Sequence, residues 1–190
     1  TINYCLPWQR KHYDWPDLPK GYQNTLSGSG AVPVGVAGNF HGIRIREMHL
    51  EEDPASWEPG TGAVDYNRSG LPLVEIVTEP DFSTAEEVSA WLGKLLHHLA
   101  YLKAVDSNAG IKVDVNVNIP GKSERVELKN MSSIEDIAHA IEYELARQGK
   151  EGGKVQETRR YDAAKGKTSV MRTKEGSADY RYFPEPDLPP

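Results

Sequence analysis

The chain has 190 residues, of which 38% are hydrophobic and 26% charged, and its formal net charge at pH 7 is −6. This composition is typical of a soluble globular protein with one well-buried domain or two small ones. The sequence contains no apolar run long enough to span a bilayer and no signal-peptide pattern at its start. The acidic balance argues against a broad, nonspecific nucleic-acid surface, because phosphate binding needs clustered lysines and arginines. The single cysteine, Cys5, excludes an internal disulfide and favours a reducing, cytoplasmic setting.

The first part of the chain predicts loops and strands. Turn-forming residues dominate residues 1–30, which indicates an ordered loop with short extended pieces. Residues 32–36 and 43–50 predict a β-hairpin with its turn at residues 38–39. Residues 71–78 (LPLVEIVT) are almost continuously apolar and predict a mostly buried strand.

Two amphipathic helices are expected further along the chain. The first begins at Ser83, with Glu86 three residues later as in a capping box. Apolar residues then recur at helical spacing over residues 88–102. The second helix is expected from about residue 133 to residue 148, with Gly149 as its C-terminal cap.

Strand patterns flank the second helix. Residues 111–119 (IKVDVNVNI) alternate strictly between apolar and polar, and residues 125–129 (RVELK) alternate in the same way. A hairpin turn at residues 120–123 joins them, and residues 154–160 and 168–174 predict another hairpin. This mixture predicts an α+β fold, in which the helices cover one face of a largely antiparallel mixed sheet.

Acidic residues within strand patterns are the candidate functional residues. Carboxylates are depleted in strands, yet Glu75, Asp114 and Glu127 lie between apolar neighbours, and Glu51 and Glu52 end another strand. Carboxylates that converge from several strands suit Mg²⁺, which takes oxygen ligands and bridges them to nucleotide phosphates. The alternative is a solvated sheet face with incidental ion pairs. Glu75 is expected to be buried among its apolar neighbours, where a carboxylate needs a partner or a metal.

Sequence motifs for other chemistries are absent. The chain has no Gly-x-x-x-x-Gly-Lys-Ser/Thr phosphate loop and no Gly-x-Ser-x-Gly nucleophile elbow. Nucleotide binding would therefore rely on a metal ion and on basic side chains of a sheet. The candidates for phosphate contact are Arg68, Lys112, Lys129, Arg159, Arg160, Arg172 and Arg181.

Eight stretches carry a family resemblance by their order and spacing. They are YDWPDLPKGYQ (13–23), HLEED (49–53), VDYNRSGLPLVEIVTEPD (64–81), DVNVNI (114–119), RVELKN (125–130), AIEYELARQ (140–148), QETRRYD (156–162) and DYRYFPEPDLPP (179–190). Together they resemble the GatB/GatE family of glutamyl/aspartyl-tRNA amidotransferase subunits, and they look closest to archaeal-type GatB members. The paralogous GatE branch is the second choice.

The resemblance implies that residues 1–190 are part of a catalytic cradle domain related in fold to glutamine synthetase. It places the family's N-terminal metal-site strand before this segment and its helical and tail domains after it, so the isolated segment is expected to be inactive. The implied reaction is ATP-dependent amidation of Asp-tRNA(Asn) or Glu-tRNA(Gln). ATP phosphorylates the side-chain carboxylate, and ammonia from a partner amidase subunit then replaces the phosphate. A small third subunit is a further expected partner, and no membrane is expected.

The same resemblance implies roles for individual residues. The expected Mg²⁺ ligands are Glu51 or Glu52, Glu75, Asp114 and Glu127. We expect catalytic roles for Glu127, Lys129 and Arg181, and ATP contacts from Lys112, Asn116, Arg159 and Arg160.

Two other functions remain open. A non-catalytic scaffold that only binds the amidase subunit predicts that changes at Asp114 or Glu127 cost little. A magnesium-dependent carboxylate–amine ligase acting on a small molecule predicts ATP turnover without tRNA. The aromatic tail over residues 180–183 also has two interpretations: Arg181 lines a path for ammonia or substrate, or the rings form a packed plug.

Overall fold

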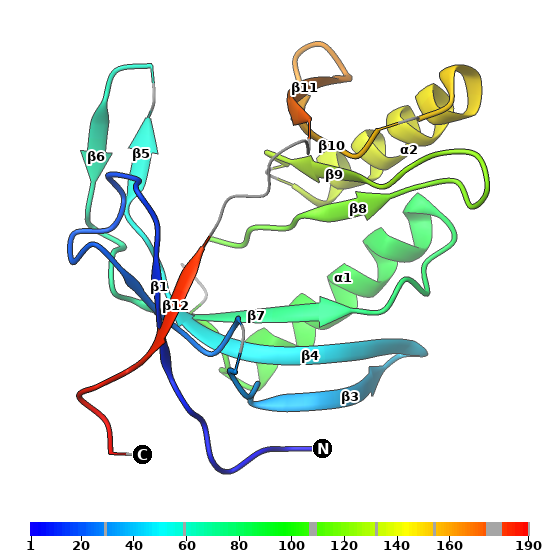
Figure 1. Ribbon diagram of the computed structural model, residues 1–190. Coiled ribbons are helices and arrows are strands. Elements are labelled where there is room, and N and C mark those ends of the chain that lie inside the picture. Colours follow the sequence, from blue (N-terminus) through cyan, green and yellow to red (C-terminus); the bar gives the residue numbers. More distant parts are fainter. Residues whose placement is uncertain are drawn as a thin grey trace. The chain divides into compact units, whose positions relative to one another are not determined.

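The computed structural model describes residues 1–28, 30–58, 60–106, 110–131, 133–153, 155–173 and 180–189. The chain divides into two compact units, one formed by residues 1–81 with 178–190 and the other by residues 82–177. Strands predominate in the first unit, and both helices belong to the second, which confirms a mixed helix and strand class (Figure 1). No helix in the described part of the chain is long and apolar enough to cross a membrane.

A six-stranded antiparallel sheet forms the first unit. Its strands follow the order β12-β1-β2-β4-β3, and β7 pairs with β4 away from this path. A separate two-stranded hairpin, β5–β6, belongs to the same unit. The bounds are β1 (Gln9–His12), β2 (Gln23–Thr25), β3 (Gly35–Phe40), β4 (Ile43–Glu52), β5 (Ser56–Glu58), β6 (Ala63–Asp65), β7 (Pro72–Thr78) and β12 (Arg181–Pro184).

The β3–β4 hairpin is confirmed, but its turn lies three residues later than predicted. His41 and Gly42 have φ values of 48° and 88°, and positive values at both central residues match the twist of a two-residue hairpin. The Gly42 amide donates a hydrogen bond to Asn39 Oδ1 at 3.2 Å. Gly38, which was expected in the turn, instead lies within β3 opposite Ile45.

A four-stranded sheet and two helices form the second unit. The strand order is β11-β10-β9-β8, in which β9 and β10 are parallel and the other neighbours antiparallel. The described strands therefore form separate sheets rather than the one sheet that was expected. The bounds are α1 (Ala85–Tyr101), β8 (Val115–Val117), β9 (Val126–Lys129), α2 (Ile134–Glu151), β10 (Glu157–Asp162) and β11 (Lys167–Thr173).

Both helices begin at a side-chain cap. Thr84 caps α1: its Oγ1 accepts a hydrogen bond from the Glu87 amide at 3.2 Å, and the Glu87 carboxylate accepts one from the Thr84 amide. This capping box lies one residue beyond the predicted pair, because the residue that adopts the extended cap conformation is Thr84 and not Ser83.

The second helix begins after Ser133 as predicted but ends later. Gly149, the expected cap, lies within α2, and Gly152 ends the helix with a φ of 65°. A positive φ is a conformation that glycine adopts without a steric penalty. The predicted position of the C-terminal glycine was therefore wrong by three residues.

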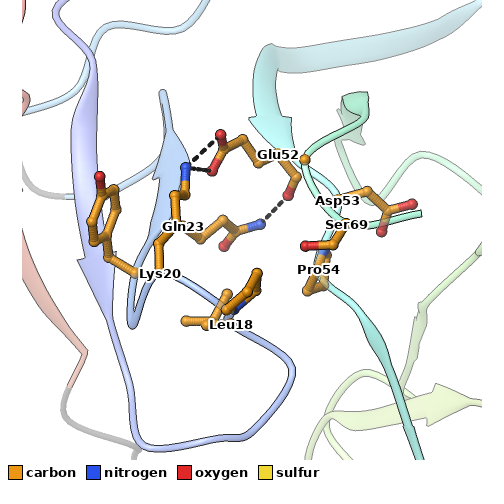
Figure 2. Close-up of a pocket in the computed structure, with 10 residues that line it drawn as sticks. Leu18, Lys20, Gln23, Glu52, Asp53, Pro54 and Ser69 are labelled. Atoms are coloured by element: carbon orange, nitrogen blue, oxygen red, sulfur yellow. Dashed lines mark hydrogen bonds and ion pairs between the residues drawn. The ribbon is translucent and has the colours of Figure 1, made fainter. Parts of the chain in front are cut away.

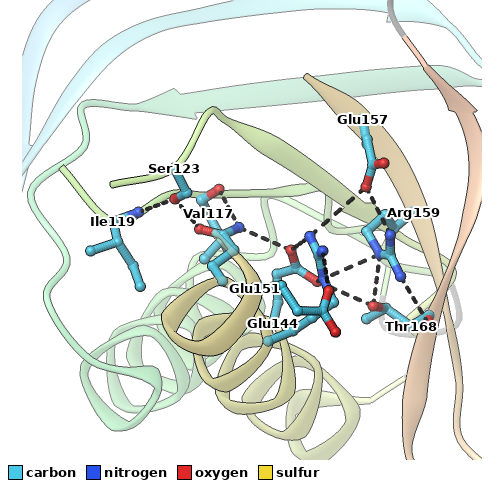
Figure 3. Close-up of polar contacts among 10 residues, drawn as sticks. Val117, Ile119, Ser123, Glu144, Glu151, Glu157, Arg159 and Thr168 are labelled. Atoms are coloured by element: carbon cyan, nitrogen blue, oxygen red, sulfur yellow. Dashed lines mark hydrogen bonds and ion pairs between the residues drawn. The ribbon is translucent and has the colours of Figure 1, made fainter. Parts of the chain in front are cut away.

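A buried polar network centred on Glu144 holds α2 to the strands of its unit (Figure 3). The Glu144 side chain is fully buried and accepts hydrogen bonds from Arg147 Nε at 3.1 Å, Gln148 Nε2 at 2.9 Å and Thr168 Oγ1 at 3.1 Å. Arg159 Nε lies 3.6 Å from Glu144 Oε2. Burial alone would raise the pKa of Glu144, but the hydrogen bonds from Arg147 and Gln148 and the nearby positive charges lower it overall.

Candidate functional site

Three side chains of the types that bind metal ions gather on one face of the β4–β7 ladder. His49 and Glu51 are two residues apart on β4 and so share a face, and Glu75 on β7 lies directly opposite His49. His49 Nε2 is 2.9 Å from Glu75 Oε2, and one ligand atom of each residue lies within 4.8 Å of the other two. Among the described residues, this is the one cluster of at least three His, Cys, Asp or Glu side chains within that reach.

The electrostatics of this group favour a bound cation. Burial raises the pKa of Glu51, and the nearby charge of Glu75 raises it further. The hydrogen bond to Glu75 raises the pKa of His49 above its ordinary value. A divalent cation would relieve the repulsion between the two carboxylates, which are the donors that Mg²⁺ prefers. The donor chemistry of the two carboxylates therefore fits Mg²⁺, and the imidazole holds Glu75 through its hydrogen bond.

Glu75 is half-exposed, which corrects the expectation that it is buried. Its side chain retains 50% exposure, whereas that of His49 retains 5%. Alternation along β7 directs Val74 and Ile76 to the face opposite Glu75, so its apolar neighbours in sequence do not enclose it. The buried member of the pair is thus the histidine.

His49 was not among the ligands predicted from the sequence. A signal was available, because His49 precedes Glu51 by two residues within the same strand pattern. What the sequence alone lacked was the register that sets His49 opposite Glu75.

Glu52 has other partners: Figure 2 shows its carboxylate turned towards Lys20. Its carboxylate accepts hydrogen bonds from Lys20 Nζ at 2.6 and 2.7 Å, and its backbone carbonyl accepts one from Gln23 Nε2 at 2.7 Å. These three residues help to line a pocket of about 190 Å³. Adjacent strand residues face opposite sides, so of the two neighbouring glutamates only Glu51 lies with Glu75.

A second group of predicted site residues lies on the four-stranded sheet. Lys129 Nζ is 2.7 Å from Asp114 Oδ2 and 3.7 Å from Glu127 Oε1. Thr158 Oγ1 donates to Glu127 Oε2 at 3.0 Å, and Arg172 Nε donates to Thr158 Oγ1 at 3.4 Å. Burial alone would lower the pKa of Lys129, but its contacts with the two carboxylates raise it overall. Lys129 therefore offsets one of the two negative charges on the carboxylates that the resemblance assigns to metal.

The whole chain, with both groups of residues, matches a known family. Residues 1–190 match the family described as the GatB/GatE catalytic domain. The chain belongs to this family.

Archaeal relatives of this GatB/GatE family chain share nearly half of their aligned residues with it. It is 50% identical over 193 residues to a protein of Methanopyrus kandleri, 47% identical over 187 residues to one of Methanobrevibacter smithii and 46% identical over 197 residues to one of Methanocaldococcus jannaschii. Each is named as the B subunit of an aspartyl/glutamyl-tRNA(Asn/Gln) amidotransferase, and the alignments cover 100%, 96% and 100% of this chain. The chain spans about two fifths of the length of these curated relatives (41%, 40% and 41%).

Three of the predicted ATP contacts of this GatB/GatE family chain lie at exposed positions. Lys112 and Asn116 are exposed, and Asn116 lies opposite Glu127 in the β8–β9 ladder. Arg160 is exposed, lies beside Lys129 in the parallel β9–β10 ladder and donates to Ser169 Oγ at 3.4 Å.

Arg159 lies on the other face of β10. It is 8% exposed, and its guanidinium donates to Thr168 Oγ1 at 2.9 Å and to Glu157 Oε2 at 2.7 Å (Figure 3). Strand alternation turns Arg159 towards Glu144 on α2, whereas Arg160 points the opposite way. This placement engages the Arg159 guanidinium in the buried network, and its contact with ATP stays a prediction.

The site residues of this GatB/GatE family chain are divided between its two units. Glu51, Glu75 and Arg181 belong to the first unit, and Asp114 and Glu127 belong to the second. Within its own unit each group comes from segments distant in sequence that strand pairing brings together. Arg181 lies on β12 and lines an aromatic pocket of about 450 Å³.

Proposed function

We propose that this GatB/GatE family chain carries out the ATP-dependent step of tRNA amidation, acting on Asp-tRNA(Asn) or Glu-tRNA(Gln). The observation that carries the proposal is the grouping of His49, Glu51 and Glu75 in a chain of this family. The names of its relatives, which specify an aspartyl/glutamyl-tRNA amidotransferase subunit, support the choice of substrate. We further propose that residues 1–190 form part of a glutamine synthetase-like cradle domain.

The proposed reaction has two steps. The γ-phosphoryl group of ATP passes to an oxygen of the aminoacyl side-chain carboxylate, and ADP leaves. Ammonia, supplied by a partner amidase subunit, then attacks the acyl carbon. The bond from that carbon to the phosphate oxygen breaks, phosphate leaves, and the nitrogen loses a proton to give the amide. A small third subunit completes the proposed complex.

Glu51 and Glu75 would hold Mg²⁺, with His49 as the residue that orients Glu75. Bound Mg²⁺ would neutralise charge on the phosphate oxygens. Glu52 is left out of the ligand set because its carboxylate is engaged by Lys20.

A separate group of side chains, within the second unit, carries the other proposed phosphate contacts. Lys129 offers an ammonium group that Asp114 holds in place at 2.7 Å, and Glu127 is fixed by Thr158 at 3.0 Å. Lys112, Asn116 and Arg160 are exposed and are the proposed further contacts to ATP. Positive groups held in place before the reaction lower the cost of developing phosphoryl charge.

The test is ADP release by the full-length protein with its amidase partner, glutamine, Mg²⁺ and misacylated tRNA. Glu75→Gln keeps the shape of the side chain but removes its charge. We expect ADP release to fall by about 100-fold, which corresponds to about 2.7 kcal/mol of transition-state stabilisation.

Glu79→Gln is the matched control, since Glu79 directly follows β7 and its ion pair is with Arg46 at 2.9 Å. The control should stay within about twofold of wild type, because exposed ion pairs contribute little. If Glu75→Gln matches wild type, the metal site is wrong. ADP release that needs no tRNA would instead favour a ligase acting on a small molecule.

A further inference from the structure

An aromatic pocket of about 450 Å³ lies between the ends of β1 and β12 in the first unit. Its lining includes the rings of His12, Tyr13, Trp15, Tyr180 and Phe183. From the sequence, residues 180–183 had two interpretations: a packed aromatic plug, or a path for ammonia or substrate.

The exposure of these rings argues against a packed plug. Trp15 retains 56% of its surface, Phe183 52% and Tyr180 39%. Such large apolar side chains are usually covered when their only role is packing. The rings are also fixed by their neighbours: Tyr13 meets Tyr180 edge-to-face at 5.9 Å and Trp15 at 6.3 Å. The pocket therefore contains aromatic rings that neighbouring rings hold in place but that remain exposed, so a flat ligand can stack on them.

Positive charge accompanies the rings. Arg181 lines the pocket and is exposed, and within the described ranges no acidic side chain forms an ion pair with it. Lys11 Nζ lies 4.4 Å from the centroid of the Tyr180 ring, and one acidic residue, Asp14, also lines the pocket. A planar guanidinium beside aromatic rings suits a phosphate group attached to a stacked base.

We propose that this pocket binds one nucleotide, with its base stacked on Trp15 and Phe183 and its phosphate paired with Arg181. The inference rests on the proposed function, in which two substrates are nucleotides with an available base. One is the adenine of ATP, and the other is the unpaired base at the 3′ end of the tRNA. Both have the same chemistry, a flat base with a phosphate beside it.

Equilibrium binding to the full-length protein tests the proposal without turnover. Two probes are used: AMP-PNP with Mg²⁺, and an RNA minihelix that ends in the single-stranded 3′ end of tRNA. We expect Trp15→Ala and Arg181→Gln each to weaken binding of one probe by tenfold or more, which lies within the usual effect of losing one stacked base. Trp15→Phe keeps a ring and should restore most of the affinity.

Two controls match these variants. Tyr101→Ala removes an aromatic side chain that is 82% exposed on α1, and Arg125→Gln removes an exposed guanidinium near β9. Both should bind each probe within about twofold of wild type. Thermal melting of every variant shows whether folding is retained.

The outcomes separate the two sources of the base. A loss confined to AMP-PNP assigns the pocket to ATP, and a loss confined to the minihelix assigns it to the RNA. Unchanged affinity for both probes in folded Trp15 and Arg181 variants overturns the proposal, as does a wild-type protein that binds neither probe. If the pocket variants bind both probes normally and the wild type still releases ADP, the pocket proposal is wrong and the proposed function stands. If the wild type binds a probe but releases no ADP, the proposed function alone is contradicted.

Discussion

His49 on β4 lies directly opposite Glu75 on β7, and its Nε2 is 2.9 Å from Glu75 Oε2. The histidine is buried while the glutamate is half-exposed, so His49 can hold the carboxylate in one orientation towards a ligand. Groups that orient a metal ligand typically contribute about 10- to 100-fold to metal affinity or activity.

We therefore predict that His49→Ala lowers ADP release by about 10- to 100-fold. The variant leaves Glu75 charged but unsupported, so a higher Mg²⁺ concentration should recover part of the lost activity. ADP release measured across a Mg²⁺ titration checks this. His139→Ala, at an exposed position of α2, is the control. A His49 variant with wild-type Mg²⁺ dependence would show that the histidine has no part in the site.

Asp114→Asn removes the closest partner of the Lys129 ammonium. We predict that ADP release falls by about 100-fold, or about 2.7 kcal/mol, because Lys129 loses the charge that positions it. Steady-state kinetics at saturating Mg²⁺ is the measurement. Asp162→Asn is the control, since Asp162 also pairs with a lysine, Lys165, at 3.0 Å. Equal rates for both variants would indicate that Asp114 lies on an ordinary solvated sheet face, or that the protein is a non-catalytic scaffold.

Glu144→Gln should destabilise the second unit. The carboxylate is fully buried, and loss of its charge leaves the guanidinium groups of Arg147 and Arg159 with Glu157 as the one carboxylate they still share among the described residues. Breaking a buried pair in this way typically costs about 3–5 kcal/mol. Urea unfolding at pH 7 measures the change, and Glu142→Gln on the exposed side of α2 should have little effect. A Glu144 variant as stable as wild type would mean that the buried network makes no net contribution to the free energy of unfolding.

The stability of the wild type and that of the Glu144→Gln variant should depend differently on pH. The pKa of Glu144 is lowered in the folded state, so its contribution is fully present above the unfolded value of 4.5 and is lost as pH falls through the folded value. The stability gap between wild type and Glu144→Gln should thus be constant near neutral pH and narrow below about pH 4.5. Unfolding midpoints from about pH 3 to pH 8 test the sign, and a gap that widens in acid would contradict it.

Two glycines of α2 should respond in opposite directions to alanine. Gly149 lies within the helix with open space at its Cβ position, so Gly149→Ala should stabilise by up to about 1 kcal/mol. Gly152 has a φ of 65°, so Gly152→Ala should destabilise by about 1 kcal/mol. Thermal unfolding of the two variants is the measurement. If Gly149→Ala destabilises the protein and Gly152→Ala stabilises it, the helix ends at Gly149 and not at Gly152.

Local pattern alone predicted most of the elements. Strict alternation identified the strand around Glu127, and apolar spacing identified both helices, because side-chain periodicity depends on backbone geometry within one segment. The strand predicted over residues 111–119 is shorter, since β8 covers only Val115–Val117 and Asp114 precedes it. Helix ends were less predictable. Thr84 was preferred to Ser83, and Gly152 to Gly149, because neighbouring residues compete for the same cap.

Tertiary structure decided which predicted residues meet. The pairing of His49 with Glu75, the separation of Glu51 from Glu52 and the turn of Arg159 towards Glu144 all depend on strand register and on which face packs. A carboxylate such as Glu144 is typical of helix surface in sequence, yet it is buried because Arg147, Gln148 and Thr168 satisfy it. Periodicity thus determined the elements and the family motifs of this chain. Long-range pairing determined its candidate site, since the energy of a buried or shared charge depends on partners that no local pattern specifies.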